Sequence, residues 1–286
     1  MRRWIGLVAA VLLLGACQAQ PSQKDTARAA DAATTSALTA RAGQAEVAAG
    51  KLVAMSQGSA TSGQAPRQDD PAAGPLLDQV FDTSALPALG RTPADLTQMS
   101  RWLAAVMKVG QVYVLAGTGF TDPTKATTDA AQAQSLRNVV DYAPETGRFF
   151  DAATVLLSVE GASIDYQSIV NSAKIDPGQR ESVMTDLQYK IEKTYSSELG
   201  FMLNKGPTDA WKEARIKVLA TEATRVSGML LPGSWGHLQQ QARQIAAQSD
   251  DPVLKRYLEL FATRIEPPQY RTPALESAGE HGYNGA

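Results

Sequence analysis

The chain has 286 residues, and its 27 Lys and Arg residues nearly balance its 29 Asp and Glu residues, for a formal net charge of −2. This slightly acidic composition gives no electrostatic reason to expect a nucleic-acid partner. One cysteine and two histidines are too few for an internal disulfide bond or for the usual Cys and His ligands of a zinc site. We therefore expect neither nucleic acid nor a metal ion.

The N-terminus has the pattern of a secretory signal peptide over residues 1–16. Arg2 and Arg3 precede an apolar run over residues 4–14, and the small residues Gly15 and Ala16 come after it. This order of charge, apolar core and small residues is typical of a segment that is removed after export. Spanning a bilayer takes roughly 20 apolar residues, so the run is too short for a permanent membrane anchor.

Cys17 comes directly after this segment, and the sequence Leu-Gly-Ala-Cys over residues 14–17 resembles the lipobox of bacterial lipoproteins. The resemblance implies that the Cys17 thiol carries a diacylglycerol, that residues 1–16 are removed, and that the new amino terminus is acylated. Several acyl chains hold a protein to a membrane far more firmly than one. Gln18 stands where an aspartate would indicate inner-membrane retention, so the resemblance implies the outer membrane, at its periplasmic face. The alternative is an ordinary signal peptide with a cysteine at its boundary.

Residues 17–75 differ in composition from residues 76–266. They are rich in Ala, Gln and Ser, and no aromatic residue occurs between positions 18 and 75. Such a segment has little apolar surface to offset the entropy lost on ordering. We predict a flexible tether that separates the domain from the membrane. Within it, residues 36–55 are alanine-rich enough to form a weak helix.

Residues 76–266 contain successive apolar stripes with helical spacing. Helix starts are predicted where a capping residue precedes proline or an apolar run, at Thr92-Pro93, Asp176-Pro177, Thr208 and Asp251-Pro252. No convincing strand pattern interrupts them, although residues 112–116 also suit a strand. We predict an all-α domain, a bundle of six to seven helices, followed by a C-terminal tail over residues 267–286.

Two glycines and one proline predict local features of the helices. Gly110 lies within an apolar stripe and would permit close approach of a neighbouring element. Gly117 is expected to end that helix. Pro232 is expected to stop the helix that contains Trp211.

Few residues are candidates for catalysis. The sequence has no phosphate-binding glycine loop and no serine-nucleophile motif, so we predict no cofactor and no recognisable enzyme. His237 is expected at the surface or near a helix start. Glu160 is the one carboxylate that shares a face with the most apolar stripe, three residues after Leu157. It is a weak catalytic candidate, because a structural ion pair or an edge position explains it as well.

Trp211, Trp235 and Tyr257 are large aromatic residues near the C-terminal helices. The ordinary interpretation is that they belong to the core. If the helices leave them exposed, they would be anchors for a protein partner.

The sequence is compatible with three functional hypotheses, ranked in this order. The first is a membrane-anchored helical interaction module, a scaffold or accessory subunit of a cell-envelope assembly with a protein partner there. The second is a periplasmic binding protein that holds a small apolar ligand or a peptide between its helices. The third is a carboxylate-dependent cell-wall hydrolase with Glu160 as its acid.

Overall fold

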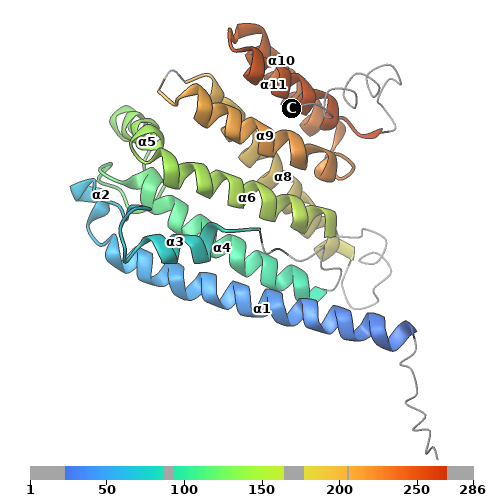
Figure 1. The fold of residues 1–286 in the computed structure, drawn as a ribbon. Helices are drawn as coiled ribbons and strands as arrows, with labels where there is room; N and C mark the ends of the chain where they lie inside the picture. The colour runs from blue at the N-terminus through green and yellow to red at the C-terminus, as the bar shows by residue number, and fades with distance from the viewer. Residues whose placement is uncertain (1–22, 85, 87–92, 164–176, 205, 269–286) are drawn as a thin grey trace, which may run out of the picture.

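The computed structural model describes residues 23–84, 86, 93–163, 177–204 and 206–268, and its regular elements in these ranges are helices (Figure 1). They are α1 (Gln23–Met55), α2 (Ser59–Ser62), α3 (Gly74–Phe81), α4 (Pro93–Leu115), α5 (Asp129–Asp141), α6 (Ala143–Ser163), α8 (Pro177–Met202), α9 (Asp209–Val226), α10 (Pro232–Gln248) and α11 (Pro252–Arg264). The predicted all-α class is confirmed. The signal peptide, Cys17 and the tail from residue 269 lie outside the described residues.

The helices form a stacked bundle. α1, α4, α6 and α9 lie one beside the next, and α11 packs on α9 at the far side (Figure 1). α8 contacts α6, α9 and α10, and the short α3 packs between α1 and α4. This order leaves α4 and α8 both in contact with α6, which is the arrangement that creates the candidate functional site.

Local sequence signals explain several helix ends. The Thr208 side chain accepts a hydrogen bond from the Trp211 backbone N–H at 3.2 Å, and Asp251 Oδ1 accepts one from Val253 N at 2.8 Å. These two predicted N-caps are therefore confirmed, whereas the other two, Thr92 and Asp176, lie outside the described residues. Gly117 has φ of 68° just after α4, a left-handed conformation that favours glycine and ends the helix as predicted. Pro232 does not stop α9, which ends at Val226; it lies instead at the first position of α10, where a missing N–H costs nothing.

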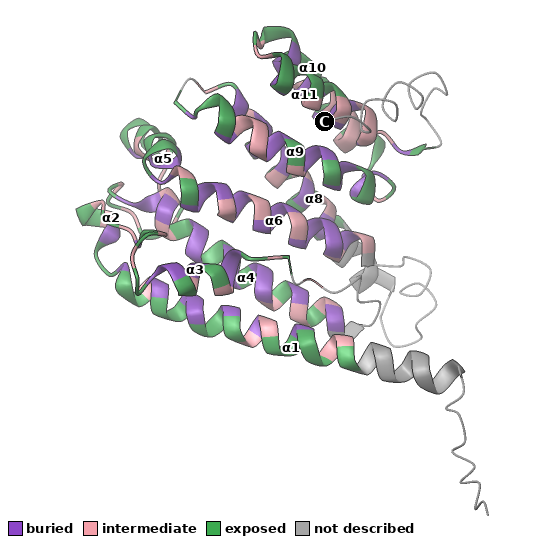
Figure 2. Cartoon of the chain, in the orientation of Figure 1, coloured by how far each residue is buried: buried purple, intermediate pink, exposed green. Residues whose placement is uncertain are grey.

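The predicted flexible tether is wrong for most of its length, because α1 is part of the bundle. One face of α1 packs against α4 and α3, while its opposite face is exposed (Figure 2). Over residues 33–55, where the side chains are described, the buried apolar residues are Leu38, Ala42, Ala45, Ala48, Ala49 and Leu52. After α2, the chain remains attached to the body, since the Tyr113 hydroxyl donates to Pro66 O at 2.8 Å. The helical domain therefore begins before residue 76, in α1.

Alanine explains the error. It contributes little apolar area per residue, but it has the highest helix propensity and lets a neighbouring helix approach closely. Polar links then fix α1 in place. Arg41 donates to the carbonyl oxygens of Asp78 at 3.0 Å and Asp82 at 2.7 Å, near the end of α3. Arg101 of α4 forms an ion pair with Glu46 of α1. The prediction of a helix within 36–55 is confirmed, and the helix is longer than expected.

Gly110 allows the close approach that its position predicted. A Cβ atom at this position would lie 2.6 Å from Phe149 Cζ and would overlap the ring. The Phe149 ring thus lies directly against the backbone of α4, and it also contacts Phe81 and Phe150, with ring centroids 6.4 and 5.0 Å away. Aromatic contacts of this kind join α3, α4 and α6 into one core.

Among the described residues, no helix has the length and apolar character needed to cross a membrane.

Candidate functional site

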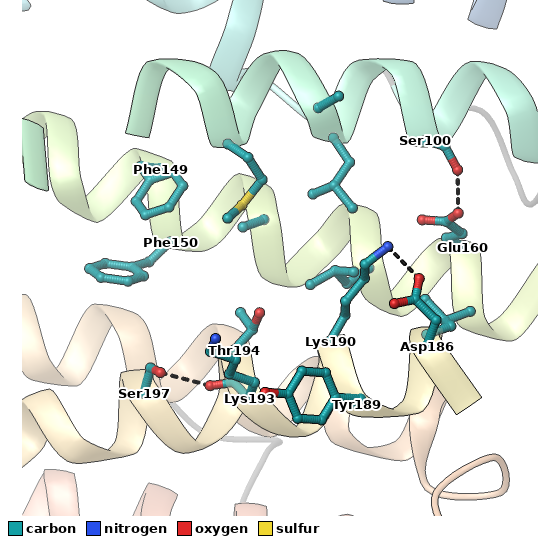
Figure 3. Close-up of a pocket in the computed structure, with 16 residues that line it drawn as sticks. Ser100, Phe149, Phe150, Glu160, Asp186, Tyr189, Lys190, Lys193, Thr194 and Ser197 are labelled. Atoms are coloured by element: carbon teal, nitrogen blue, oxygen red, sulfur yellow. Dashed lines mark hydrogen bonds and ion pairs between the residues drawn. The ribbon is translucent and has the colours of Figure 1, made fainter. Parts of the chain in front are cut away.

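A groove of about 720 Å³ lies between α4, α6 and α8 (Figure 3). α6 provides its floor, since α4 and α8 both pack on that helix. The volume is within the roughly 300–1,000 Å³ typical of small-molecule sites.

The floor of the groove is apolar and preformed. Phe149 and Phe150 are each 7% exposed, and Leu157 and Ala153 of α6 are almost completely buried. Leu103 of α4 and Leu187 of α8 complete the apolar lining. These residues belong to the main hydrophobic core, so their positions do not depend on a ligand. A ligand would be held here by burial of apolar surface.

One end of the groove is polar. There the Ser100 hydroxyl of α4 donates a hydrogen bond to Glu160 Oε1 of α6, and Lys190 forms an ion pair with Asp186 at 2.6 Å along α8 (Figure 3). Burial raises the pKa of Glu160 above its ordinary value of 4.5, and Asp186 adds to this effect. The Ser100 hydrogen bond and the Lys190 charge oppose it. The site thus combines an apolar floor with a carboxyl group whose charge is costly.

The rim carries exposed side chains that a ligand would cover. Met107 of α4 is 38% exposed and Tyr189 of α8 is 61% exposed. The Lys193 ammonium lies 5.8 Å from the centre of the Tyr189 ring. A flexible thioether and an aromatic ring adapt readily to apolar ligands of different shape.

The structure places Glu160, the predicted candidate, in this groove. The predicted partner anchors behave differently. Trp211 is buried, and its Nε1 donates to Ala143 O at 3.1 Å, so it belongs to the core and cannot anchor a partner. Trp235 and Tyr257 are half-buried and pack against the same core. The ordinary interpretation as a core residue is therefore confirmed for Trp211. His237 is exposed, 3.4 Å from Glu192 Oε1, as expected of a surface histidine.

A second set of ionisable groups, which the sequence reasoning missed, lies between α6, α8 and α9. Arg215 forms an ion pair with Asp151 at 2.5 Å, and burial raises the pKa of Asp151 to about 6 although Arg215 opposes it. Glu198 is 1% exposed and accepts a hydrogen bond from the Thr154 hydroxyl. Burial raises the pKa of Glu198 well above its ordinary value.

The signal for Glu198 was present in the sequence. It lies three residues after Tyr195, on the face of an apolar stripe, and this is the same kind of spacing that singled out Glu160. None of the four residues of this buried cluster lines the groove. We therefore assign the cluster to helix packing and the groove to function.

In the described part of the chain, no three His, Cys, Asp or Glu side chains are arranged so that they could hold a metal ion. No model of a known protein family matches this chain, and neither characterised proteins nor solved structures provide a match. The function is therefore inferred from the groove.

Proposed function

We propose that the protein is a lipid-anchored binding protein of the bacterial envelope, which holds a small apolar ligand in the groove between α4, α6 and α8. The observation that carries the proposal is the groove itself, with a volume of about 720 Å³ and a floor of core aromatic and aliphatic side chains. A preformed apolar cavity with few polar groups is the usual form of a small-molecule site.

The position of the aromatic residues changes the ranking of the three hypotheses. A protein-interaction module was the leading expectation, but Trp211, one of its three candidate anchors, is buried. The groove supports the ligand-binding alternative instead. Its floor consists of core side chains that offer apolar surface, which favours an apolar ligand over the sugar chain that a cell-wall hydrolase binds.

Ala104 offers a direct test, because it lines the groove and its side chain is exposed. We expect Ala104→Phe to fill the groove without disturbing the core. The probe is N-phenylnaphthylamine, an uncharged dye whose fluorescence rises in apolar surroundings. The full chain carrying Cys17→Ser, which has no thiol to acylate, should bind the dye saturably, and Ala104→Phe in that background should abolish binding.

Ala247→Phe is the matched control. Ala247 is also an exposed helical alanine, but it lies on α10 and does not line the groove. We expect this variant to bind the dye as the parent chain does. Equal dye binding by the parent chain and Ala104→Phe would refute the assignment of the groove as the binding site.

The anchor is the second part of the proposal. It is supported by the signal-peptide pattern and by the Leu-Gly-Ala-Cys sequence that ends at Cys17. Cys17→Ser should accumulate as an unprocessed precursor that does not incorporate labelled fatty acid in cells. Normal cleavage and labelling of this variant would contradict the anchor, and Gln18→Asp should redirect the protein from the outer to the inner membrane.

A protein-interaction module remains a second candidate function, favoured by the exposure of Met107 and Tyr189 on the groove rim. Methionine and aromatic residues are common in protein interfaces. Photocrosslinking from position 189 in cells distinguishes the two. One crosslinked envelope protein in fixed proportion would support an interaction module, whereas crosslinks to extractable small molecules would support ligand binding.

A further inference from the structure

The polar end of the groove contains the carboxyl group of Glu160, which forms no ion pair with any residue that the structure describes. Glu160 accepts a hydrogen bond from Ser100, but among the described residues no Lys, Arg or His nitrogen lies within 4 Å of its carboxyl oxygens. A partly buried carboxylate is stabilised strongly by an opposite charge placed against it. Among the described lining residues, this end of the groove therefore has no positive charge that pairs with Glu160.

The neighbouring charges do not supply it. Lys190 is the nearest basic residue in this part of the groove, and Asp186 holds its ammonium at 2.6 Å. Lys190 and Asp186 act on the Glu160 carboxyl group in opposite directions, with the Lys190 charge having the larger effect, but the Lys190 ammonium is paired with Asp186 and not with Glu160. Glu160, Asp186 and Lys190 together thus leave one net negative charge when Glu160 is ionised. The local charge favours a cationic group and disfavours an anionic one.

Among the lining residues that the structure describes, Lys193 is the other basic side chain and would favour an anion. It lies on the groove rim, is exposed, and stands over the Tyr189 ring. A solvated ammonium contributes little to the binding of a counter-ion, because water screens its charge. Glu160 is less exposed than Lys193, because its side chain is half-buried where α6 meets α4 and it accepts a hydrogen bond from Ser100. The charge with the larger effect on binding is therefore the negative one.

Building on the proposed function, we infer that the ligand class is a cationic amphiphile, whose protonated amine or quaternary ammonium pairs with Glu160 while its apolar part covers the floor formed by Leu103, Leu157, Phe149 and Phe150. The groove combines this apolar floor with a charged end formed by Glu160, Asp186 and Lys190 (Figure 3), which matches a molecule with a charged head and an apolar tail. Glu160 is then a binding residue rather than a catalytic acid.

The test compares three probes with the same alkyl chain and different heads: dodecyltrimethylammonium, dodecanol and dodecanoate. Isothermal titration of the full chain carrying Cys17→Ser, below the micelle concentration of each probe, gives the three affinities. We expect the quaternary ammonium to bind about tenfold more tightly than dodecanol, since the Coulomb attraction of one partly screened charge pair is worth about one decade in Kd. Dodecanoate should bind more weakly than dodecanol.

Glu160→Gln should abolish the preference for the cationic probe while retaining binding of dodecanol. Glu259→Gln removes the same charge from an exposed position on α11 outside the groove, and it should leave the preference unchanged. A preference that survives Glu160→Gln, or a preference for dodecanoate, would overturn the inference and leave the proposed function standing. Failure of all three probes to bind would overturn both.

A second measurement needs no variant at Glu160. The quaternary ammonium keeps its charge at every pH, so its affinity relative to dodecanol reports on the protein alone. Among the described residues, Ser100 of α4 and Asp186 and Lys190 of α8 are the groups that interact with Glu160 across the groove. We expect the relative affinity to fall as pH is lowered and Glu160 becomes protonated. A relative affinity that rises or stays constant on acidification would contradict the inference.

Discussion

Replacing Gly110 with alanine tests how closely α6 approaches α4. A Cβ atom at this position would lie 2.6 Å from Phe149 Cζ, so the ring must move. Inserting one methyl group into a packed core costs roughly 1–3 kcal/mol. Alanine also stabilises a helix interior by about 1 kcal/mol relative to glycine. The two effects oppose each other, and we expect a net loss of stability between about 0 and 2 kcal/mol.

Gly43→Ala isolates the packing effect. Gly43 lies within α1, and no atom outside its own helix backbone would be within 4 Å of a Cβ placed there. This variant should be more stable than the parent chain by roughly 0.5–1 kcal/mol, because only the helix propensity changes. The difference between the two variants, measured by urea unfolding, is therefore expected to be roughly 1–3 kcal/mol. Equal stabilisation by both alanines would refute the contact between Gly110 and Phe149.

The same substitution has a functional consequence. Phe149 lines the groove, and Phe81 and Phe150 bound its ring on other sides. In Gly110→Ala, we expect the displaced Phe149 ring to enter the groove. This variant should therefore bind N-phenylnaphthylamine more weakly than the parent chain does. Gly43→Ala should bind the dye as the parent chain does.

Two further predictions concern α1 and the buried acids. Leu52→Ala should destabilise the domain by roughly 2–5 kcal/mol in urea unfolding, since Leu52 is fully buried; a change below about 0.5 kcal/mol, as at a surface site, would restore a flexible tether. The pKa of Asp151 is raised from 3.8 to about 6 in the folded protein, so the folded state holds its proton over that range. Its contribution to stability is present at acid pH and is lost as pH rises through about 6, by at most about 3 kcal/mol. Urea unfolding of the parent chain and of Asp151→Asn between about pH 4 and pH 7 gives the stability of the parent chain relative to the variant. This relative stability should fall steadily as pH rises, and a value that stays constant would contradict the raised pKa.

The fold class was predictable because helix signals are local. Capping at Thr208 and Asp251 and the glycine at position 117 depend on a few neighbouring residues, and the structure confirms them. α1 was misjudged because its stability comes from alanine packed against α4 and from the Arg41 and Glu46 contacts with other helices. Contacts with distant parts of the chain cannot be predicted from the composition of one segment.

The groove could be predicted only in part. Helical spacing placed Glu160 on the face of an apolar helix, and the structure puts it at the edge of an apolar floor. The groove itself depends on the distance between α4 and α8 where both pack on α6. The spacing of residues within one helix does not predict that distance. Trp211 shows the same limit, because its burial depends on Ala143 and Phe150 of another helix.

The central claim is that the groove binds an apolar ligand, and methionine methyl NMR tests it at one position. Met107 lines the groove, whereas Met55 is similarly exposed at the end of α1 and lies outside it. Titration of dodecanol into the methyl-labelled full chain carrying Cys17→Ser should shift the Met107 signal saturably and leave Met55 unchanged. An unperturbed Met107 signal, or equal shifts of both signals, would contradict ligand binding in the groove.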